Sequence, residues 1–250
     1  MNLFNVYTPT LGEEGLEDTI ESVQIQSYPN VKHILVTDTE KGHDQVRTIL
    51  NKLKPKKTQH FILPEKIGKD GKFRPEYITS GIIHLINYDY WQPLGTGDWF
   101  EKEHFQNVNF VLEKHDVDWV FAFRNIYDTD KSFLCKDIFE SIGFYPVWST
   151  DNYYIVDGQS WCVSKKMLMH LGNCFRFSRE NNQRTDKFVF DVFLKHYPKL
   201  GCTNEFTINF RLNRGNEHQL NFARQWYLRG HEVMSEKFPD GKYPWIKDKF

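Results

Sequence analysis

The sequence has no excess of either charge. Its 32 basic and 33 acidic residues give a formal net charge of −1, whereas a domain that binds nucleic acid through phosphates usually carries a basic excess. We therefore expect no nucleic acid among its partners. The lysine-rich run 52–57 is local and typical of a solvated helix end and loop.

Long apolar runs and dense cysteines are also absent. No stretch reaches the roughly 18 apolar residues that span a bilayer, and the first residues lack the basic start and apolar core of a signal peptide. We expect no transmembrane segment, no signal peptide and a cytoplasmic location. The four cysteines have neither CxxC spacing nor a zinc pattern with histidine, so we expect reduced thiols.

Three widespread motifs are missing. No G-x-G-x-x-G follows the first predicted strand and no Walker A loop occurs, which argues against dinucleotide-binding and P-loop enzymes. No G-x-S-x-G elbow is present, which argues against a serine hydrolase of the α/β type.

What the sequence does contain is a large apolar content and many aromatic rings. Hydrophobic residues make up 40% of the 250 residues, with 21 Phe, 12 Tyr and 7 Trp. This length fits one large domain. The rings allow two interpretations, a bulky core or a groove whose flat walls stack on sugars or bases.

Strand and helix patterns alternate along the first third of the chain. They predict strands at 3–7, 31–36 and 60–63, and helices at 16–26 and 44–53. This β-α-β-α-β order favours an α/β fold with a mostly parallel central sheet flanked by helices. Further helices are predicted at 99–113, 186–196 and 219–237. No repeat or low-complexity linker divides the chain, so we expect a single domain over 1–250.

The opening segment carries a recognisable pattern. It reads T-P-T from Thr8, then L-E-D-T-I-E-S-V-Q-I-Q-S-Y-P-N-V from Leu16, then a strand that ends H-I-L-V-T-D at Asp38. This resembles family 2 glycosyltransferases, whose members read T-x-x, then L-x-x-x-I-x-S-[IV]-x-x-Q-[ST]-Y-x-N, then a strand ending in Asp-Asp. The match is dense over 5–38, and weaker features continue to about 215.

The resemblance implies a GT-A fold and a hexosyltransferase-like activity. The enzyme would move a sugar from a nucleotide-sugar, with a UDP-sugar favoured, to a glycan or other hydroxyl acceptor, with inversion. It would place a nucleotide-binding half at about 1–98, an acceptor and catalytic half at about 99–215, and a C-terminal helix at about 219–237.

The expected nucleotide site lies at strand ends. Ligands of open parallel sheets bind beyond the carboxyl ends of the strands, where Thr8 and Asp38 fall. A carboxylate can accept from a base N–H and a hydroxyl can bond a base carbonyl. By resemblance, Thr8, Thr10 and Asp38 hold the base, and the alternative for each is a helix cap or turn.

Two arginines are candidates for the diphosphate, because a guanidinium fork suits its oxygens. Arg74 closes the segment Gly71–Arg74, where family members carry a Gly- and Arg-containing loop. Arg211 lies in a segment that resembles the Y-R-x-H motif near the end of the family's sequence pattern, with Asn213 in place of the His. Each can also be an ordinary surface or strand-edge charge.

The main departure from the family falls at Leu94–Trp99. Members usually read L-D-x-D-D-[WFY] there, and the acids hold Mn²⁺ or Mg²⁺ against the donor phosphates, because hard cations prefer carboxylate oxygens. Gly95 and Gly97 replace the acidic pair and leave Asp98. Either Asp98 helps to hold a metal ion, or the backbone N–H groups of the two glycines meet the phosphates directly.

Asp186 is the candidate catalytic base. The segment Thr185–Asp191 resembles the one whose Asp takes the acceptor proton in inverting members. We expect Asp186 to have an ordinary pKa near 3.9 and to be ionised at neutral pH. The alternative is an N-terminal helix acid.

The segment Asp157–Trp161 lies where members bind donor and acceptor sugars. Asp157 could accept from sugar hydroxyls, and Trp161 could stack on a pyranose or belong to the core. A different class also fits the sequence. Without the acidic pair, the chain could be an inactive GT-A module that binds a nucleotide-sugar or glycan.

Overall fold

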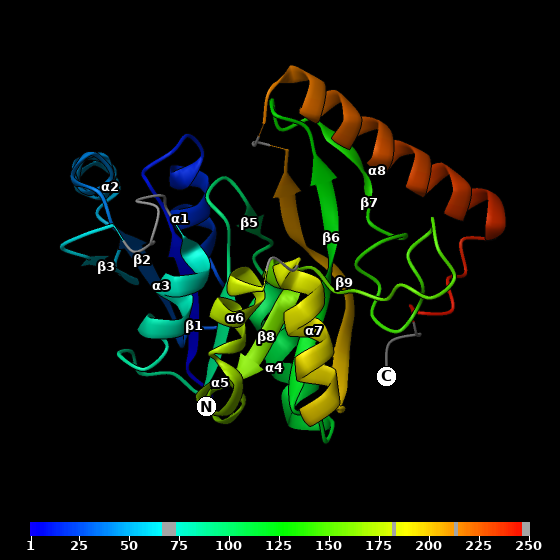
Figure 1. The fold of residues 1–250 in the computed structure, drawn as a ribbon, viewed down its shortest axis with the longest axis horizontal. Helices are drawn as coiled ribbons and strands as arrows, with labels where there is room; N and C mark the ends of the chain where they lie inside the picture. The colour runs from blue at the N-terminus through cyan, green and yellow to red at the C-terminus, as the bar shows by residue number, and fades with distance from the viewer. Residues whose placement is uncertain (67–73, 182–183, 213–214, 247–250) are drawn as a thin grey trace.

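The computed structural model describes residues 1–66, 74–181, 184–212 and 215–246. A nine-stranded sheet runs through their centre in the order β3-β2-β1-β4-β8-β6-β9-β5, with β7 paired to β6 (Figure 1). The strands are β1 (Phe4–Pro9), β2 (Val31–Thr37), β3 (Thr58–Ile62), β4 (Tyr90–Pro93), β5 (Trp99–Phe100), β6 (Trp119–Tyr127), β7 (Phe133–Lys136), β8 (Trp161–Ser164) and β9 (Leu200–Arg211).

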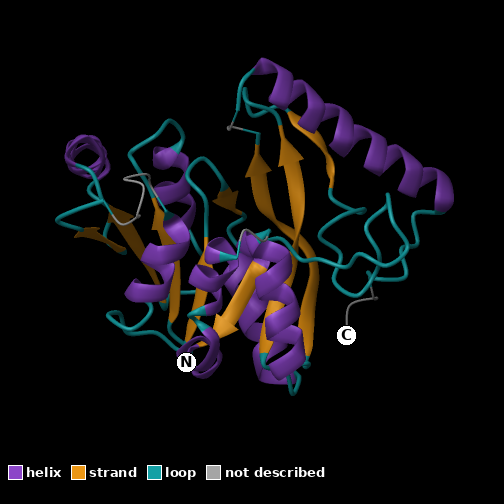
Figure 2. Cartoon of the chain, viewed as in Figure 1, coloured by secondary structure: helices purple, strands orange, loops and turns teal. Residues whose placement is uncertain are grey.

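Helices cover both faces of this sheet (Figure 2). They are α1 (Leu16–Gln24), α2 (Glu40–Leu53), α3 (Pro75–Ile82), α4 (His104–Lys114), α5 (Lys165–Leu171), α6 (Cys174–Glu180), α7 (Thr185–His196) and α8 (Glu217–Lys237), with a 3₁₀ turn η1 (Gly158–Ser160) before β8. None of these helices has both the length and the apolar character needed to cross a bilayer.

Most strands of the sheet share one direction. β1 pairs in parallel with β2 and β4, β2 with β3, and β6 with β9. β8 is antiparallel to both β4 and β6, so β6 and β9 keep the direction of β1. Only β5, β7 and β8 run the other way. The predicted α/β fold with a mostly parallel sheet is confirmed.

Alternation along β6 separates two layers of core. Phe121 and Phe123 face the cluster that contains α6, α7 and the buried Trp161. Val120 and Ala122 face the cluster that contains Phe105 and the rest of α4. Successive strand residues point to opposite faces, so one fully buried strand supplies both layers.

The prediction of a helix over 99–113 is wrong at its start. Trp99 and Phe100 form β5, which pairs with Asn209 and Ile208 of β9, and α4 begins at His104. A strand pair between segments more than a hundred residues apart leaves no local periodicity to detect. The helices expected at 186–196 and 219–237 are present, and each begins one or two residues earlier.

The cysteines, the C-terminal helix and the aromatic rings can also be compared with the expectations. The four cysteines form no disulfide, as expected, and three of them are buried. The C-terminal helix α8 crosses the β7 side of the sheet (Figure 1) and buries chiefly Gly230 and Met234. The core supports the bulky-core interpretation for many of the aromatic rings, because Trp91, Trp119 and Trp161 are among its largest fully buried side chains.

Candidate active site

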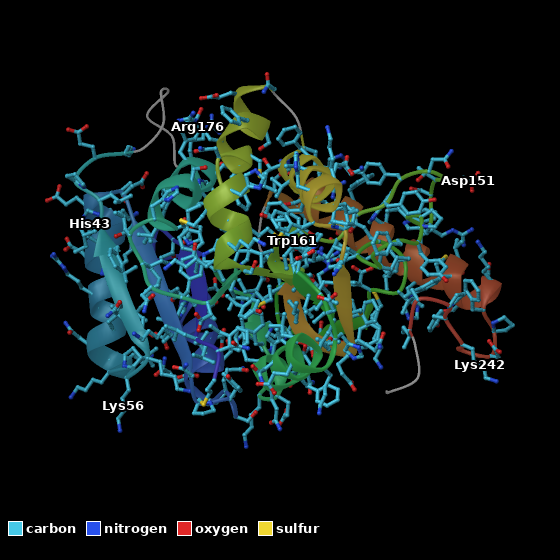
Figure 3. The ribbon with its side chains drawn as sticks, turned by 90° about the horizontal axis from the view of Figure 1, so that it is seen from below. His43, Lys56, Asp151, Trp161, Arg176 and Lys242 are labelled. Carbon is cyan, nitrogen blue, oxygen red and sulfur yellow. The ribbon has the colours of Figure 1, made fainter. Side chains whose placement is uncertain are left out.

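A cavity of about 540 Å³ opens at the carboxyl ends of β1 and β4. Its walls come from the ends of these strands, the starts of α3 and α7, η1, β8, α6 and β9. The lining residues that carry polar or charged groups on their side chains are Tyr7, Glu76, Thr79, Trp91, Asp157, Gln159, Trp161, Arg184, Thr185 and Asp186. Trp161 is labelled near the centre of Figure 3. Ligands of open α/β sheets bind at such an edge.

Thr8 does not belong to this cavity, which corrects the sequence prediction. Tyr7 and Pro9 line the cavity, and Thr8 lies between them on the opposite face of β1. Thr8 is fully buried, with its hydroxyl 3.0 Å from Nε2 of His33. Burial lowers the pKa of His33 to about 3, so this pair is a neutral core contact.

Thr10 shapes a loop instead of presenting a free hydroxyl. Its Oγ1 donates to Glu13 Oε2 at 2.8 Å and accepts from the Gly12 N–H at 3.0 Å. The Thr96 hydroxyl also donates to it at 2.9 Å. Thr10 is fully buried. The turn alternative therefore fits this residue, and the predicted contact with the base does not.

Asp38 lies where the sequence predicted, directly after β2 at the carboxyl edge of the sheet. It is buried, and it is not among the residues that line the cavity. Burial raises the pKa of Tyr7 well above its usual range, the Thr79 side chain opposes the rise, and the charges of Glu76 and Asp38 add to it. Both carboxylates therefore act electrostatically on this cavity residue.

Arg74 immediately precedes α3, whose first residues Pro75 and Glu76 line the cavity. The rest of the predicted Gly71–Arg74 loop lies outside the described residues. Arg211 is elsewhere: it is buried, its Nη2 donates to the Glu14 carbonyl at 3.3 Å, and it borders a separate hollow of about 350 Å³. The structure thus does not bring Arg211 together with Asp186.

The loop 94–98 is held tightly. The Gly95 N–H donates to Oε1 of Gln159, and the Gly97 N–H donates to the Thr19 hydroxyl at 2.9 Å. The expectation that these N–H groups face phosphates is therefore wrong, because side chains of the protein already take both. Gly97 adopts φ +92°, a conformation that glycine reaches without strain.

The residues at this loop do not fit a divalent cation. Asp98 is 3% exposed, and its Oδ1 accepts the Arg211 N–H at 2.8 Å. A Cβ at Gly95 would lie 2.6 Å from Asp98 Oδ2, so a side chain at position 95 would collide with this carboxylate. Among the described residues, no three His, Cys, Asp or Glu side chains converge as metal ligands do.

Asp186, the predicted base, lies in the cavity at the first turn of α7. Its carboxylate packs against the backbone of η1, since a Cβ at Gly158 would come within 2.7 Å of Asp186 Oδ1. The glycine therefore permits this close approach. Asp186 thus lies against the segment that follows Asp157, almost thirty residues earlier in the chain.

Asp157 is part of a buried ionic cluster around Arg124. The Arg124 guanidinium contacts Asp137 at 2.6 Å, Asp157 at 2.8 Å and Glu140 at 3.2 Å. Arg184, at the cavity wall, reaches Glu140 at 3.5 Å. The other Asp157 oxygen accepts the Gln159 N–H at 3.0 Å. Asp157 is therefore oriented by Arg124 and in turn orients η1.

This cluster changes the acidity of Asp186. Burial raises the pKa of Asp186 from 3.8 to about 7, the charge of Asp157 adds to the rise, and Arg184 and Arg124 oppose it. The expectation of an ordinary pKa is wrong. A carboxyl in a low-dielectric site next to a second carboxylate resists ionisation, and a base with a pKa near the working pH is suited to proton transfer.

Trp161 is a core residue with an edge at the cavity. It is 1% exposed, its indole N–H donates to the Val156 carbonyl at 2.9 Å, and it packs against Phe193 and Trp119. No ring face remains for a sugar to stack on, so the core interpretation holds.

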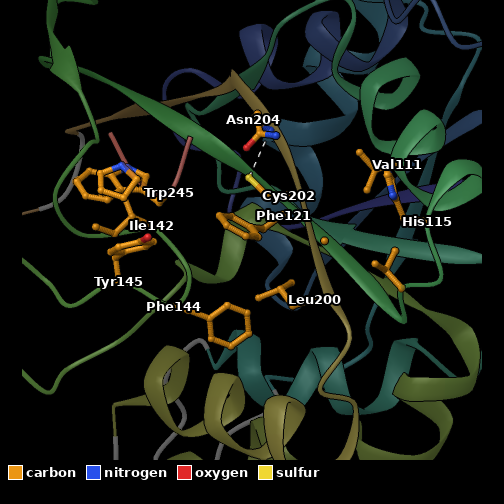
Figure 4. Close-up of a pocket in the computed structure, with 13 residues that line it drawn as sticks. Val111, His115, Phe121, Ile142, Phe144, Tyr145, Leu200, Cys202, Asn204 and Trp245 are labelled. Carbon is orange, nitrogen blue, oxygen red and sulfur yellow. Dashed lines mark hydrogen bonds between the residues drawn. The ribbon is translucent and has the colours of Figure 1, made fainter. Parts of the chain in front are cut away.

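A second cavity, of about 410 Å³, lies near the starts of β6 and β9 (Figure 4). Phe121, Ile142, Phe144, Tyr145 and Trp245 give it a mainly apolar wall, with His115 and Val111 on the far side. It contains no pair of carboxylates, so the first cavity is the better candidate for chemistry.

Several residues of the site were not singled out from the sequence. Arg124 lies inside a buried strand, and nothing local marks it as the centre of an ionic cluster. Arg184 and Glu76 look like ordinary surface charges. Gln159 and Gly158 were inside the segment that the resemblance highlighted, and this proximity was the one available signal.

No family model and no curated protein sequence matches the chain. Several solved structures match the fold of the chain. S. aureus TarS 1-349 in complex with UDP-GlcNAc aligns with a TM-score of 0.58 and 13% identity, over 87% of this chain and 60% of that one. The mannosyltransferase PcManGT from Pyrobaculum calidifontis, in complex with GDP-Man and Mn²⁺, aligns with a TM-score of 0.59 and 13% identity, over 97% and 66%. The chain thus has the GT-A fold, and it spans about three fifths of the first of these proteins.

Proposed function

We propose that this chain is a family 2-like glycosyltransferase that passes a sugar, with inversion, from a nucleoside diphosphate donor to a hydroxyl acceptor. The observation that carries the proposal is Asp186, a carboxyl with a pKa near 7 in a cavity at the carboxyl edge of a GT-A sheet. Such an edge is where α/β enzymes bind nucleotides.

In the proposed step, the acceptor oxygen forms a bond to the anomeric carbon while the bond from that carbon to the diphosphate oxygen breaks. The electron pair of the broken bond leaves with the nucleoside diphosphate. The acceptor's proton passes to Asp186, which must be ionised at the start. Arg124, acting through Asp157, positions this part of the site, and Gly158 allows Asp186 to lie close to η1.

For the donor we propose a UDP-hexose, with the base held near Asp38. The resemblance over residues 5–38 supports this, as does UDP-GlcNAc in the TarS structure. Asp38→Ala would remove a buried polar contact and weaken nucleotide binding by about 1–3 kcal/mol. Unchanged affinity for UDP, GDP and dTDP would argue against Asp38 as the base reader.

A product assay tests the function directly. The protein would be incubated with UDP-, GDP- and dTDP-sugars and a panel of glycan and small hydroxyl acceptors, and products would be followed by mass spectrometry. We expect transfer from a UDP-sugar to one acceptor class. Nucleotide-sugar binding without transfer to any acceptor would favour the inactive binding module, and the absence of binding would refute both.

A further inference from the structure

The place where the resemblance expects metal-binding acids is filled by a neutral amide. A Cβ at Gly95 would lie 2.9 Å from Oε1 and 3.2 Å from Nε2 of Gln159. The Gln159 carboxamide therefore occupies the space into which a side chain at position 95 would project. It lies there beside Asp98, whose Oδ2 is 2.6 Å from the same point.

Gln159 is held on three sides. Its backbone N–H donates to Asp157 Oδ1 at 3.0 Å, and its carbonyl accepts from Gln92 Nε2 at 2.9 Å. Its side-chain Oε1 accepts the Gly95 N–H. Gln92 is itself fixed by His104 at 2.9 Å. The carboxamide is thus oriented before any ligand arrives, which lowers the entropy lost on binding.

This arrangement leaves the side-chain nitrogen of Gln159, Nε2, as a hydrogen-bond donor for a ligand. An N–H can meet only an acceptor, so the carboxamide atom at Gly95 must be the oxygen, and the –NH₂ group is the other end. Within the described part of the chain, Nε2 makes no hydrogen bond, and Gln159 lines the cavity. A phosphate oxygen is a strong acceptor for such a donor.

We propose, on the basis of the proposed function, that the donor site works without a bound divalent cation and that Gln159 Nε2 donates to the donor's diphosphate. Asp98 Oδ1 accepts the Arg211 N–H, and within the described residues Asp98 belongs to no group of three or more metal-ligating side chains. A neutral amide needs no counter-ion and leaves the buried Asp98 undisturbed. Gln159 is therefore a donor-binding residue.

The test measures nucleotide affinity by calorimetry, with UDP, GDP and dTDP as probes, in EDTA and in Mn²⁺. For the wild type we expect a dissociation constant that changes by less than about twofold between the two conditions. Gln159→Met keeps the side-chain length and removes the donor, so we expect binding to weaken about 10-fold. Gln225→Met, on the exposed side of α8, is the matched control and should bind like the wild type.

A second variant gives a readout that does not depend on nucleotide. Gln159→Glu keeps an oxygen for the Gly95 N–H and places a second carboxylate beside Asp98. We expect this variant to bind Mn²⁺ alone, detected by electron paramagnetic resonance, and to bind UDP more tightly in Mn²⁺ than in EDTA. The wild type should show neither effect.

The outcomes separate the two proposals. Wild-type binding that requires Mn²⁺, or a Gln159→Met variant that binds as tightly as the wild type, would overturn this inference and leave the proposed function intact. Failure of all three nucleotides to bind in either condition would overturn the proposed function itself.

Discussion

The loop 94–98 and the start of α7 border the same cavity, and they differ in charge. The loop keeps one carboxylate, Asp98, and that carboxylate is bonded to a backbone N–H. The charges of two further carboxylates, Asp157 and Glu140, and of two guanidinium groups, Arg184 and Arg124, act on Asp186. The end that would bind the leaving group is nearly neutral, while the end that would take the proton is densely ionic.

This difference shows that two edges of one cavity can carry very different charge. Gly95 has no side chain, and Gln159 and Asp98 lie where one would project. A base, by contrast, needs neighbours that set its pKa, because a buried carboxyl responds to every charge nearby. Asp186 keeps those neighbours. The predictions below test whether chemistry is indeed concentrated at the ionic end.

The largest expected effect is on turnover. Asp186→Asn keeps the shape of the side chain and removes its basicity, so we expect kcat to fall about 10²–10⁴-fold, the usual contribution of a general base. Donor affinity should barely change, because the base acts in the transition state. Single-turnover kinetics and calorimetry measure the two quantities.

The control for this variant lies on the same helix. Asp191 pairs with Lys187 on the exposed surface, and Asp191→Asn should transfer sugar at the wild-type rate. Equal rates for Asp186→Asn and the wild type would mean that Asp186 is a helix acid and that the base lies elsewhere.

The next effect is on stability. Arg124→Met removes the cation that faces the buried Asp137 and Glu140 and the half-buried Asp157, and breaking a buried ionic cluster on one side destabilises by about 3–5 kcal/mol. Denaturant unfolding followed by circular dichroism measures the loss. Arg229→Met breaks an exposed pair with Glu232 and should change the free energy of unfolding by less than about 1 kcal/mol. Similar losses for both variants would contradict the comparison.

A third effect is the pH dependence of the reaction. Because the base must be ionised and its pKa is about 7, kcat/KM should rise about tenfold per pH unit up to pH 7 and level off above it. Asp157→Asn removes the neighbouring charge that raises this pKa, so the rise should shift to lower pH. A profile that stays in place in this variant would show that the two carboxyls do not interact.

The smallest effect is a gain in stability. The folded pKa of Asp186, about 7, exceeds its unfolded value. Its stabilising contribution is therefore complete below the unfolded pKa and is lost as pH rises through 7. The Asp186→Asn variant has no charge to bury. Above pH 7 its free energy of unfolding should therefore exceed that of the wild type by about 1 kcal/mol or more. Thermal unfolding at pH 8 and pH 5 measures this, and the difference should be smaller at pH 5.

The sequence by itself determined the frame of the molecule. Periodicity and the opening pattern predicted the α/β fold, the place of Asp38 after β2, and Asp186 at the start of α7, because these features depend on residues that are neighbours in the chain. The resemblance also predicted that the loop 94–98 departs from the acidic pattern usual in family 2 members.

Only the tertiary structure decided how these residues work. It turned Thr8 away from the cavity, since side chains alternate across a strand whose faces are defined by neighbouring strands. It gave the Gly95 and Gly97 N–H groups partners from Gln159 and Thr19. It also brought the charges of Arg124, Glu140 and Asp157 from three distant segments to Asp186, and a pKa depends on distance in space, which no local pattern encodes.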